Sequence, residues 1–312
     1  MAKSVFVTLA VPAAAEGQRL DRFLKTARKD LPFALVQKLA RTGVICVDGK
    51  RAKPDQRLLA GQMLTLPPAQ SPAPLTSRPL VLGEEEKNKI NNMVVYEDEL
   101  MLVINKPAGL PAQGGNGIVR SVDRLLAAHY GEGNAPKLTH RIDRDTTGLL
   151  VLAKTRAAAA HITKQFADRK VGKVYLALLS AIPEQAEGDI RAPLAKQAAR
   201  GGSRAVVHGE GDFAHTAYKV VKRLEGNLAL VEATPHTGRM NQLRAHFAHI
   251  GCPLVGDGKY GGKTCKDIAK KLGAGREIPL YLHAWKLALE HPESGKALRL
   301  TAPLPAHFKA LT

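Results

Sequence analysis

A dense polar block that runs directly into an apolar strand constrains this chain more than any other feature. The block extends from His140 to Gly148 and contains two arginines and two aspartates, and the apolar run Leu149 to Ala153 follows at once. Such a run is typical of a buried strand, so the polar block must lie at the edge of a core. Carboxylates held there beside guanidinium groups stay ionised while a pocket forms around them. The block therefore suits either a salt-bridged turn or a nucleophilic or acid/base aspartate.

The charge of the chain indicates a polyanionic partner. Its 312 residues carry a formal net charge of +18, from 46 lysines and arginines against 28 aspartates and glutamates. This imbalance favours nucleic acid first and an anionic membrane surface second, although a basic enzyme with neither partner would also fit. Hydrophobic residues make up 45% of the chain, which indicates a folded protein with room for one large and one small domain.

Cysteine use and hydropathy favour a cytoplasmic location. The three cysteines show no C-x-x-C spacing, so we expect free thiols and no zinc ribbon. No apolar run has the length of a membrane span. Alternating apolar residues from Val5 to Val11 predict an edge strand rather than a signal peptide. We expect a cytoplasmic protein without a membrane partner, and we take it to be a monomer.

Three segments are predicted along the chain. Residues 1–67 are expected to form a small unit of two amphipathic helices and a hairpin that turns at Asp48-Gly49. This unit holds 12 lysines and arginines against 5 aspartates and glutamates. Residues 68–92, rich first in proline and then in charge, are expected to be a linker. Residues 93–312 form the larger domain.

The larger domain is predicted to be α+β. Its strands and helices do not alternate regularly, which argues against a doubly wound parallel sheet and favours a mixed, largely antiparallel central sheet. The periodicity predicts helices near 122–129, 156–168 and 242–250, and strands near 101–104, 149–153, 174–179, 217–221, 228–233 and 298–301.

The polar block also resembles a family signature. His140-Arg141-Ile142-Asp143 and the Thr-Thr-Gly-Leu-Leu that follows are similar to the H-R-L-D-x-x-T-S-G-L-L motif of the RluA-type RNA pseudouridine synthases. The resemblance covers almost all of residues 93–305 and implies the catalytic fold of that family. It also implies that Asp143 is the catalytic nucleophile and that Arg141 fills the gap left when the target base leaves its stack.

Three further segments resemble motifs of the same family. The strand around Tyr175 is similar to one whose tyrosine packs on the target base and is a candidate for removing the proton from carbon 5. Leu282, in a late L-x-L-H-A motif, is implied to line the base pocket. The segment around Lys106 resembles the family's first motif, and we expect it to support the catalytic loop from behind.

The segment Pro235–His246 resembles the motif P-x-T-G-R-x-H-Q-[IL]-R-x-H. The resemblance implies that its final arginine, Arg244, pairs with the catalytic aspartate and keeps it a charged nucleophile. It also makes Arg239 a candidate RNA contact. Asn241 stands where histidine is usual, so a charged contact at that position is not expected.

The front of the chain resembles an α-L RNA-binding domain, chiefly over residues 17–24. On this basis we expect Arg22, Lys38 and Arg41 to contact RNA. The alternative is a small docking domain whose basic face is simply solvated.

Two other patterns are not expected to be sites. The segment 256–264 resembles a phosphate-binding loop but has Asp257 where glycine is required, so we predict a flexible basic loop. Histidines 236, 246, 249 and 283 have no nearby carboxylate or cysteine at ligand spacing, so we predict core and hydrogen-bonding roles. We therefore expect neither a metal nor a cofactor, which suits an isomerisation that gains and loses no atoms.

The resemblance implies an enzyme that isomerises specific uridines to pseudouridine in bacterial large-subunit (23S) ribosomal RNA. Residues 105–117 resemble the RluC branch of the family more than the RluD branch. The alternatives are an RluD-type or transfer-RNA synthase, an inert RNA-binding factor for ribosome assembly, and a nucleotide hydrolase that uses Asp145 beside Asp143. Attack at carbon 6 of the base and attack at the ribose are both left open.

Overall fold

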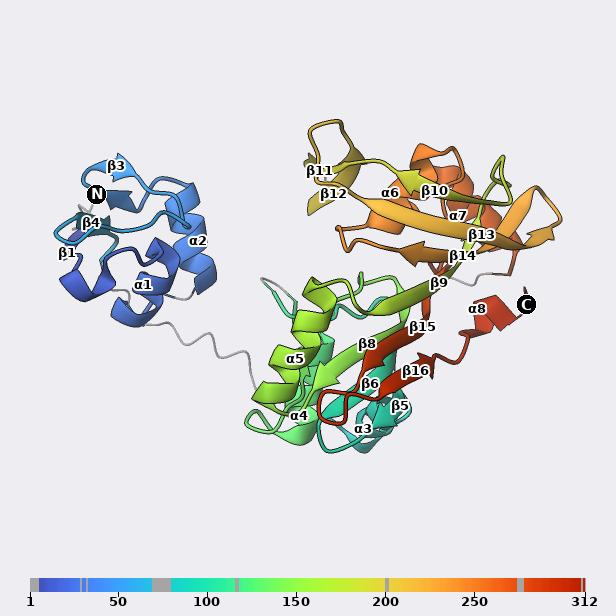
Figure 1. Cartoon of the computed structure of the whole chain (residues 1–312), viewed down its shortest axis with the longest axis horizontal. Helices are drawn as coiled ribbons and strands as arrows, with labels where there is room; N and C mark the ends of the chain where they lie inside the picture. Colours follow the sequence, from blue (N-terminus) through green and yellow to red (C-terminus); the bar gives the residue numbers. More distant parts are fainter. Residues whose placement is uncertain are drawn as a thin grey trace. The chain divides into compact units, whose positions relative to one another are not determined.

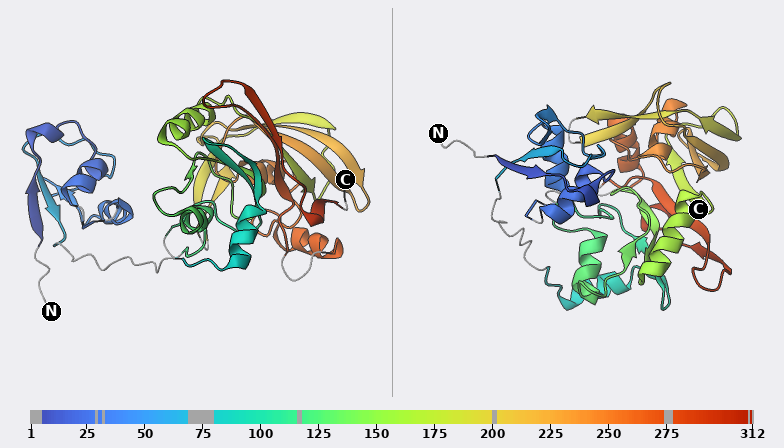
Figure 2. Two further views of the ribbon diagram at one scale, coloured as in Figure 1. Left: turned by 90° about the horizontal axis from the view of Figure 1, so that it is seen from below. Right: turned by 60° about the vertical axis from the view of Figure 1, so that its left-hand side comes forward.

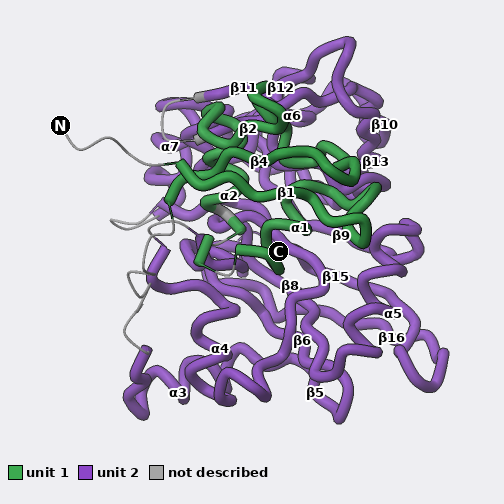
Figure 3. The backbone as a smooth tube through the Cα atoms, turned by 90° about the vertical axis from the view of Figure 1, so that its left-hand side faces the viewer, with its two compact units in different colours: residues 1–78 green, residues 79–312 purple. Residues whose placement is uncertain are grey.

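The chain divides into two compact units, residues 1–78 and residues 79–312 (Figure 3). The structure is a computed structural model. It describes residues 6–28, 30–31, 33–68, 80–115, 118–199, 202–273, 278–309 and 311. In the part of the chain so described, no helix combines the length and the apolar character needed to cross a membrane.

The first unit packs two helices against a small sheet. Its sheet has the strand order β1-β4-β2-β3, and all the pairings are antiparallel. The helices bury Leu20, Leu24 and Val36 in one core, which confirms the predicted helix pair. Its elements are β1 (Val7–Ala10), η1 (Ala13–Ala15), α1 (Leu20–Ala27), α2 (Phe33–Arg41), β2 (Cys46–Val47), β3 (Lys50–Arg51) and β4 (Met63–Leu66).

The turns of the first unit occur where the sequence predicts them. Asp48 and Gly49 both have positive φ angles, 49° and 74°, between the paired strands β2 and β3. This is the geometry of a tight hairpin with a right-handed twist. Gly43, with φ 78°, follows α2 as a left-handed residue after the helix end.

Part of the expected linker is a helix. Helix α3 (Glu84–Asn91) lies within residues 68–92, and its Ile90 is 3% exposed in a core of the second unit. The expectation of a linker up to residue 92 is therefore wrong for this stretch, because Ile90 supplies an apolar anchor within a charged helix. Residues 69–79 of the expected linker lie outside the described residues.

The second unit is built on a ten-stranded mixed sheet (Figure 1). The strand order is β10-β13-β14-β9-β15-β8-β6-β5, with β16 paired to β15 and β7 paired to β8. Only the β15–β8 pairing is parallel among these. The strands are β5 (Val94–Glu97), β6 (Met101–Lys106), β7 (Lys137–Leu138), β8 (Thr147–Ala153), β9 (Gly172–Leu179), β10 (Glu187–Arg191), β13 (His215–Leu224), β14 (Leu228–Pro235), β15 (Leu282–Glu290) and β16 (Ala297–Thr301).

Helices cover both faces of this sheet, which explains why its central strands are apolar without alternation. On β8, Leu149 and Val151 face the core under α5 (Arg156–Ala167), whereas Leu150 and Leu152 face the core under α4 (Val122–Tyr130). Figure 2 shows the second unit and its helices from two further directions. A strand buried on both faces gives a continuous apolar run, as the sequence has here.

In the other half of the sheet, the strands are again covered by helices on both faces. Helix α6 (Gln242–His249) packs Leu243 and Phe247 on one face of β9 and β14. The opposite face of these strands packs against α7 (Gly262–Lys271) and α8 (Ala306–Lys309). A separate hairpin pairs β11 (Leu194–Ala199) with β12 (Gly202–Val207). The predicted α+β fold with a largely antiparallel sheet is thus confirmed.

The two halves of the sheet meet at a point of close backbone approach. Gly148 of β8 is paired with Ala284 of β15 and has a φ of 108°. A Cβ at this position would lie 2.3 Å from the carbonyl oxygen of Ala284, closer than atoms can approach. Only glycine allows this contact. The glycine of the polar block therefore fixes the block beside the start of β15.

Candidate active site

The loop that carries Asp143 is anchored at both ends. At its start, the Nε2 atom of His140 accepts a hydrogen bond from the backbone N–H of Val151 at 2.9 Å, and its ring stacks on Phe166. Burial lowers the pKa of His140 to about 3, so the ring stays neutral and can accept. At its end, the N–H of Thr146 donates to the carbonyl oxygen of Asp143 at 3.2 Å and closes a turn.

A fully buried lysine supports this loop from behind. Lys106 is 0% exposed, and its Nζ donates to the carbonyl oxygens of Pro107, Leu110 and Arg144, each at 2.8 Å. Burial lowers the pKa of Lys106 to about 7, while the charges of Asp145 and Asp143 oppose that shift. The supporting role expected for this segment is therefore confirmed.

The carboxylate of Asp143 is contacted through one of its oxygens. The amide Nδ2 of Asn241 donates to Oδ2 at 2.5 Å, and Nη1 of Arg244 lies 3.8 Å from the same oxygen. The pairing predicted for Arg244 is present, but the closer contact comes from Asn241. No hydrogen bond to Oδ1 occurs among the described residues, so this oxygen is available to a substrate.

A second carboxylate holds Arg244 in place. Asp257 is completely buried and accepts from Nε and Nη2 of Arg244 at 2.7 and 2.8 Å. It also accepts from the backbone N–H groups of Lys259 and Tyr260. The ring of Tyr260 lies 5.3 Å from the guanidinium carbon. The atom of Arg244 that approaches Asp143 is Nη1, which makes no bond to Asp257.

The role of Asp257 corrects an expectation. Residues 256–264 were predicted to be a flexible basic loop, but Asp257 is 1% exposed and α7 begins at Gly262. The segment is ordered because its carboxylate pairs with Arg244, a residue on another element. The sequence contained the aspartate but gave no sign of its partner.

Asn241 is held in an orientation that directs its amide toward Asp143. It precedes α6 with a left-handed backbone, φ 50°, which asparagine adopts more readily than most residues. Its Oδ1 accepts from Nζ of Lys259 at 3.4 Å, whereas the hydroxyl of Tyr260 donates to the carbonyl oxygen of Ala205 at 3.0 Å. The lysine donor selects the amide orientation in which the NH₂ group points to the carboxylate.

Two other polar residues of the same motif form hydrogen bonds to neighbouring strands and loops. Gln242 accepts from Thr237 at 2.6 Å and donates to Thr216 at 3.0 Å. His246 is 0% exposed and is hydrogen-bonded through both ring nitrogens, one to Thr216 and one to the carbonyl oxygen of Ala192. The prediction of a core, hydrogen-bonding histidine is confirmed for His246.

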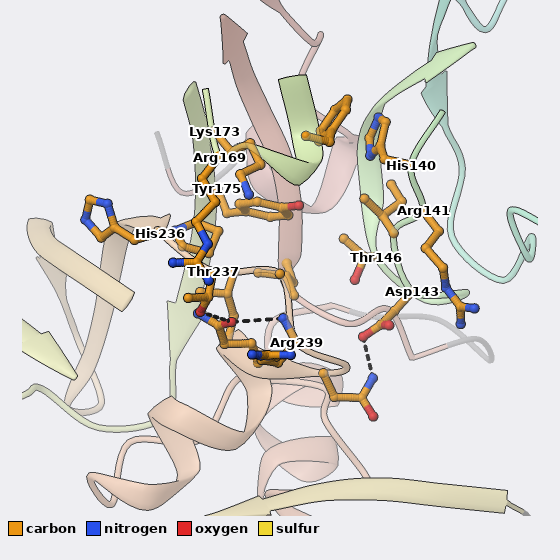
Figure 4. Close-up of a pocket in the computed structure, with 18 of the residues that line it drawn as sticks. His140, Arg141, Asp143, Thr146, Arg169, Lys173, Tyr175, His236, Thr237 and Arg239 are labelled. Atoms are coloured by element: carbon orange, nitrogen blue, oxygen red, sulfur yellow. Dashed lines mark hydrogen bonds between the residues drawn. The ribbon is translucent and has the colours of Figure 1, made fainter. Parts of the chain in front are cut away.

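One pocket of about 400 Å³ unites the predicted residues of the second unit (Figure 4). Its size is within the usual range for binding clefts. It is lined, among others, by Arg141, Asp143, Tyr175, Arg239, Arg244 and Leu282. Arg22, Lys38 and Arg41 belong to the first unit, where all three are exposed.

Tyr175 and Leu282 form the apolar side of this pocket. Tyr175 lies on β9, paired with Ala284 of β15, and Leu282 is 3% exposed. Burial and the charge of Asp143 raise the pKa of the Tyr175 hydroxyl. Tyr175 packs against two apolar cores, one that includes Leu243 and Phe247 of α6 and one that includes Leu150 and Leu152 of β8.

The arginines at the pocket differ in how they are held. Arg141 is exposed, and its side chain extends beyond Asp143, away from Tyr175 (Figure 4). Arg239 is half-buried and donates to the carboxylate of Asp212 at 3.1 Å and to the carbonyl oxygen of Phe213. Arg144 pairs with Asp145 through two hydrogen bonds. Asp145 is not among the residues that line the pocket with Asp143.

The fold and this pocket agree with comparisons to known proteins. Residues 100–249 match the family model described as RNA pseudouridylate synthase. The chain is 36% identical to ribosomal large subunit pseudouridine synthase C of Buchnera aphidicola, over 94% of this chain and 92% of that protein. On this evidence the chain belongs to the RNA pseudouridine synthase family.

Other relatives give the same result. Ribosomal large subunit pseudouridine synthase C of Haemophilus ducreyi is 34% identical over 95% of this chain and 91% of that protein. Among solved structures, human RNA pseudouridylate synthase domain containing 4 superposes with a TM-score of 0.59 and 29% identity. That match covers 72% of this chain and 92% of the human one.

Proposed function

We propose that this protein isomerises uridines to pseudouridines in bacterial large-subunit ribosomal RNA, with Asp143 as the nucleophile. The observation that carries the proposal is the carboxylate of Asp143, which lines the pocket and is contacted through Oδ2 by Asn241 and Arg244, while Oδ1 accepts no hydrogen bond among the described residues. The relatives named above act on ribosomal large-subunit RNA, which supports the choice of substrate.

The geometry suits a reaction in which one glycosidic bond replaces another. The bond from the ribose C1′ to N1 of uracil breaks, the base turns, and a bond from C1′ to C5 forms. The C5 proton leaves, N1 gains a proton, and the aspartate is released unchanged. Attack by Asp143 requires a charged carboxylate, and Arg244 stabilises that charge.

The target uridine must leave its stack before it reaches Asp143, at a cost of about a few kcal/mol. We propose that Arg141, which is exposed beside Asp143, fills the vacated position, because a guanidinium plane stacks well on bases. Tyr175 and Leu282 then hold the uracil. With a raised pKa, the hydroxyl of Tyr175 stays protonated at neutral pH, which favours a stacking surface over a proton acceptor.

The direct test is pseudouridine mapping on ribosomal and transfer RNA. A host strain lacking the gene is complemented with the wild type or with Asp143→Asn, and all pseudouridines are mapped. We expect several scattered large-subunit sites to disappear with the gene, to return with the wild type, and to stay absent with Asp143→Asn. Loss confined to transfer RNA would overturn the substrate, and full restoration by Asp143→Asn would remove Asp143 from its role.

We further propose that the first unit binds RNA through Arg22, Lys38 and Arg41. These side chains are exposed on a unit that carries an excess of positive charge. Deleting residues 1–78 should weaken binding to structured ribosomal RNA and flatten its salt dependence by roughly one unit per lost phosphate contact. Filter binding at several salt concentrations measures this, and an unchanged slope would exclude the contact.

The proposal includes the setting in which the protein works. Bacterial ribosomal RNA is made and assembled in the cytoplasm, so we place the protein there. Every residue that we propose for catalysis lies on one chain, which supports a monomeric enzyme.

A further inference from the structure

A cluster of aromatic side chains lies at the far end of the pocket from Asp143, and the isomerisation does not use it. His236 directly follows β14 and lines the pocket on the side opposite Asp143 (Figure 4). His215 begins the neighbouring strand β13, and Phe213 lies two residues before it. Asp189 is on β10, the next strand of the sheet.

Two of the rings, those of His215 and His236, are stacked on each other, and the ring of Phe213 lies beside them. The centroids of His215 and His236 are 4.3 Å apart and their planes differ by 20°. Phe213 lies 6.5 Å from His215 on a tilted plane. The backbone N–H of His236 donates to the carbonyl oxygen of His215 at 3.0 Å, so adjacent strands hold the two rings together.

Exposure and hydrogen bonding differ along this stack. His215, in the middle, has a side chain that is 16% exposed, and its Nε2 donates a short hydrogen bond to Asp189. Phe213 is 53% exposed and His236 is also exposed. Large aromatic rings at the surface beside a pocket are candidates for contact with a ligand, because their burial there is favourable.

The charges around the stack suit a nucleotide. The hydrogen bond from His215 lowers the pKa of Asp189, which therefore stays ionised and fixes the His215 ring. Partial burial and the neighbouring His215 lower the pKa of His236, so this ring is neutral at neutral pH. Lys173 and Arg191 are close enough to act on His236 as well. A neutral flat ring with cations around it can bind a base by stacking and its phosphate by charge.

A metal ion fits this cluster less well. The ligand atoms of Asp189, His215 and His236 lie within 4.8 Å of one another, and two histidines with a carboxylate can bind zinc. However, the nitrogen lone pairs lie in the ring planes, and the two planes are nearly parallel, so the lone pairs do not converge on one point. Lys173 and Arg191 would also repel a cation.

We propose that Phe213, His215 and His236 form a stacking site for an unpaired base of the RNA, next to the uridine that enters the pocket. This inference rests on the proposed function because it places a neighbouring nucleotide of the same substrate. It adds a binding position that recognises an unstacked base by its ring face and not by its hydrogen-bonding edge. Such a site would select flexible, single-stranded surroundings of the target.

The test measures base stacking directly and apart from catalysis. The probe is a nine-nucleotide single-stranded RNA with a central uridine and one adjacent 2-aminopurine, whose fluorescence falls on stacking. The full-length protein is compared with His236→Ala, with His236→Phe, which keeps a stacking ring, and with His249→Ala, an exposed histidine of α6 outside the cluster. The same RNA with an abasic ribose in place of 2-aminopurine is the control ligand.

We expect His236→Ala to weaken binding of the 2-aminopurine RNA about 10-fold, in line with the usual value of one base stacked on an aromatic ring. The quenching should be lost with this variant and retained with His236→Phe and His249→Ala. The abasic RNA should bind all four proteins alike. Equal binding and quenching by the wild type and His236→Ala would overturn the stacking site.

Two further measurements separate this proposal from its alternatives. Binding that requires added Zn²⁺, is abolished by a chelator, and is lost with both His236→Ala and His236→Phe would show a metal site instead. Pseudouridine formation is measured in parallel on ribosomal RNA. If the wild type forms no pseudouridine but shows the expected binding pattern, the proposed function is refuted and the stacking site is supported. If it forms pseudouridine normally but shows no stacking of 2-aminopurine, the stacking site is refuted and the proposed function is supported.

Discussion

The two walls of the pocket are built in opposite ways. The inner wall consists of Asn241 and Arg244, which line the pocket, together with the buried Lys106 and Asp257, which support the site from outside the pocket lining. Each of these polar side chains forms at least two hydrogen bonds within the protein. The outer wall consists of His236, which lines the pocket, and the neighbouring rings of His215 and Phe213, and two of these three rings are exposed. We infer from this difference that the inner wall fixes the position of the Asp143 carboxylate, whereas the outer wall leaves aromatic rings free to contact flexible RNA.

The largest effect should come from Arg244→Ala, which tests whether the inner wall depends on the buried ion pair between Arg244 and Asp257. The substitution leaves the carboxylate of Asp257 buried without its partner, which costs about 3–5 kcal/mol of the free energy of unfolding. Turnover should fall more than about 100-fold because the charge beside Asp143 is also lost. Denaturant unfolding and single-turnover kinetics measure the two effects.

A matched control is Lys164→Ala, which breaks an exposed ion pair with Asp168 and should change stability by less than about 0.5 kcal/mol. If Arg244→Ala is no less stable than this control, the Arg244–Asp257 pair does not hold the inner wall.

The second prediction concerns Lys106→Met and its dependence on pH. The substitution leaves three carbonyl oxygens without their donor, so we expect a loss of about 2–3 kcal/mol near pH 6. The pKa of Lys106 is about 7 in the folded protein and is depressed from 10.5. Between these values the unfolded chain binds a proton that the folded chain has released, so the wild type gains stability relative to Lys106→Met as pH rises from about 7 to about 10.

Denaturant unfolding of the wild type and Lys106→Met at pH 6, 7, 8 and 9 measures this difference. A stability difference that stays constant over this range would mean that the three carbonyl oxygens keep the ammonium charged.

The smallest effect should come from Asn241→Gly, which removes the amide side chain and with it the hydrogen bond to Asp143. Glycine accepts the left-handed backbone, so the variant isolates the loss of the amide. We expect kcat to fall about 10-fold, the equivalent of about 1.4 kcal/mol, with KM unchanged. Asn241→His, which restores the residue usual in the motif, should recover part of the rate.

Asn227→Gly provides the control for Asn241→Gly, since Asn227 has a similar backbone, φ 62°, in the turn between β13 and β14. Equal rates for the wild type and Asn241→Gly would show that the amide does not position Asp143.

The sequence predicted the residues of the inner wall that belong to contiguous motifs. Asp143 and Arg244 were found because each lies in a dense pattern of neighbouring residues. Asp257 was missed as a partner because its pairing with Arg244 depends on how α6 meets the segment before α7. For the outer wall the sequence prediction was wrong, because His236 was expected to be a core, hydrogen-bonding histidine and is exposed. The wall forms only when β10, β13 and β14 pair in their particular register.

The prediction of secondary structure likewise failed where an element depends on pairing with distant residues. Strands with long apolar runs, such as β8 and β14, were predicted, but β10 and β11 were not. Strand β10 contains a single apolar side chain, Ile190, and β11 consists largely of alanine and polar residues, which gives no β signal. Helix α7 has few apolar residues, and it begins with Gly262 directly after Gly261, so its pattern suggested a loop. Pairing and packing determine these elements more than local preference does.

The contact between Gly148 and Ala284 implies that the active site is completed late in folding. Residues separated by more than 130 positions must meet there, and the side chains of Thr147 and His283 join across the same contact at 2.8 Å. Contacts between distant segments form slowly because a long loop must first close. The strands on either side can form earlier, but the catalytic loop is not fixed beside Leu282 until this junction closes. A newly made or refolding molecule would therefore regain its secondary structure before it could act on RNA.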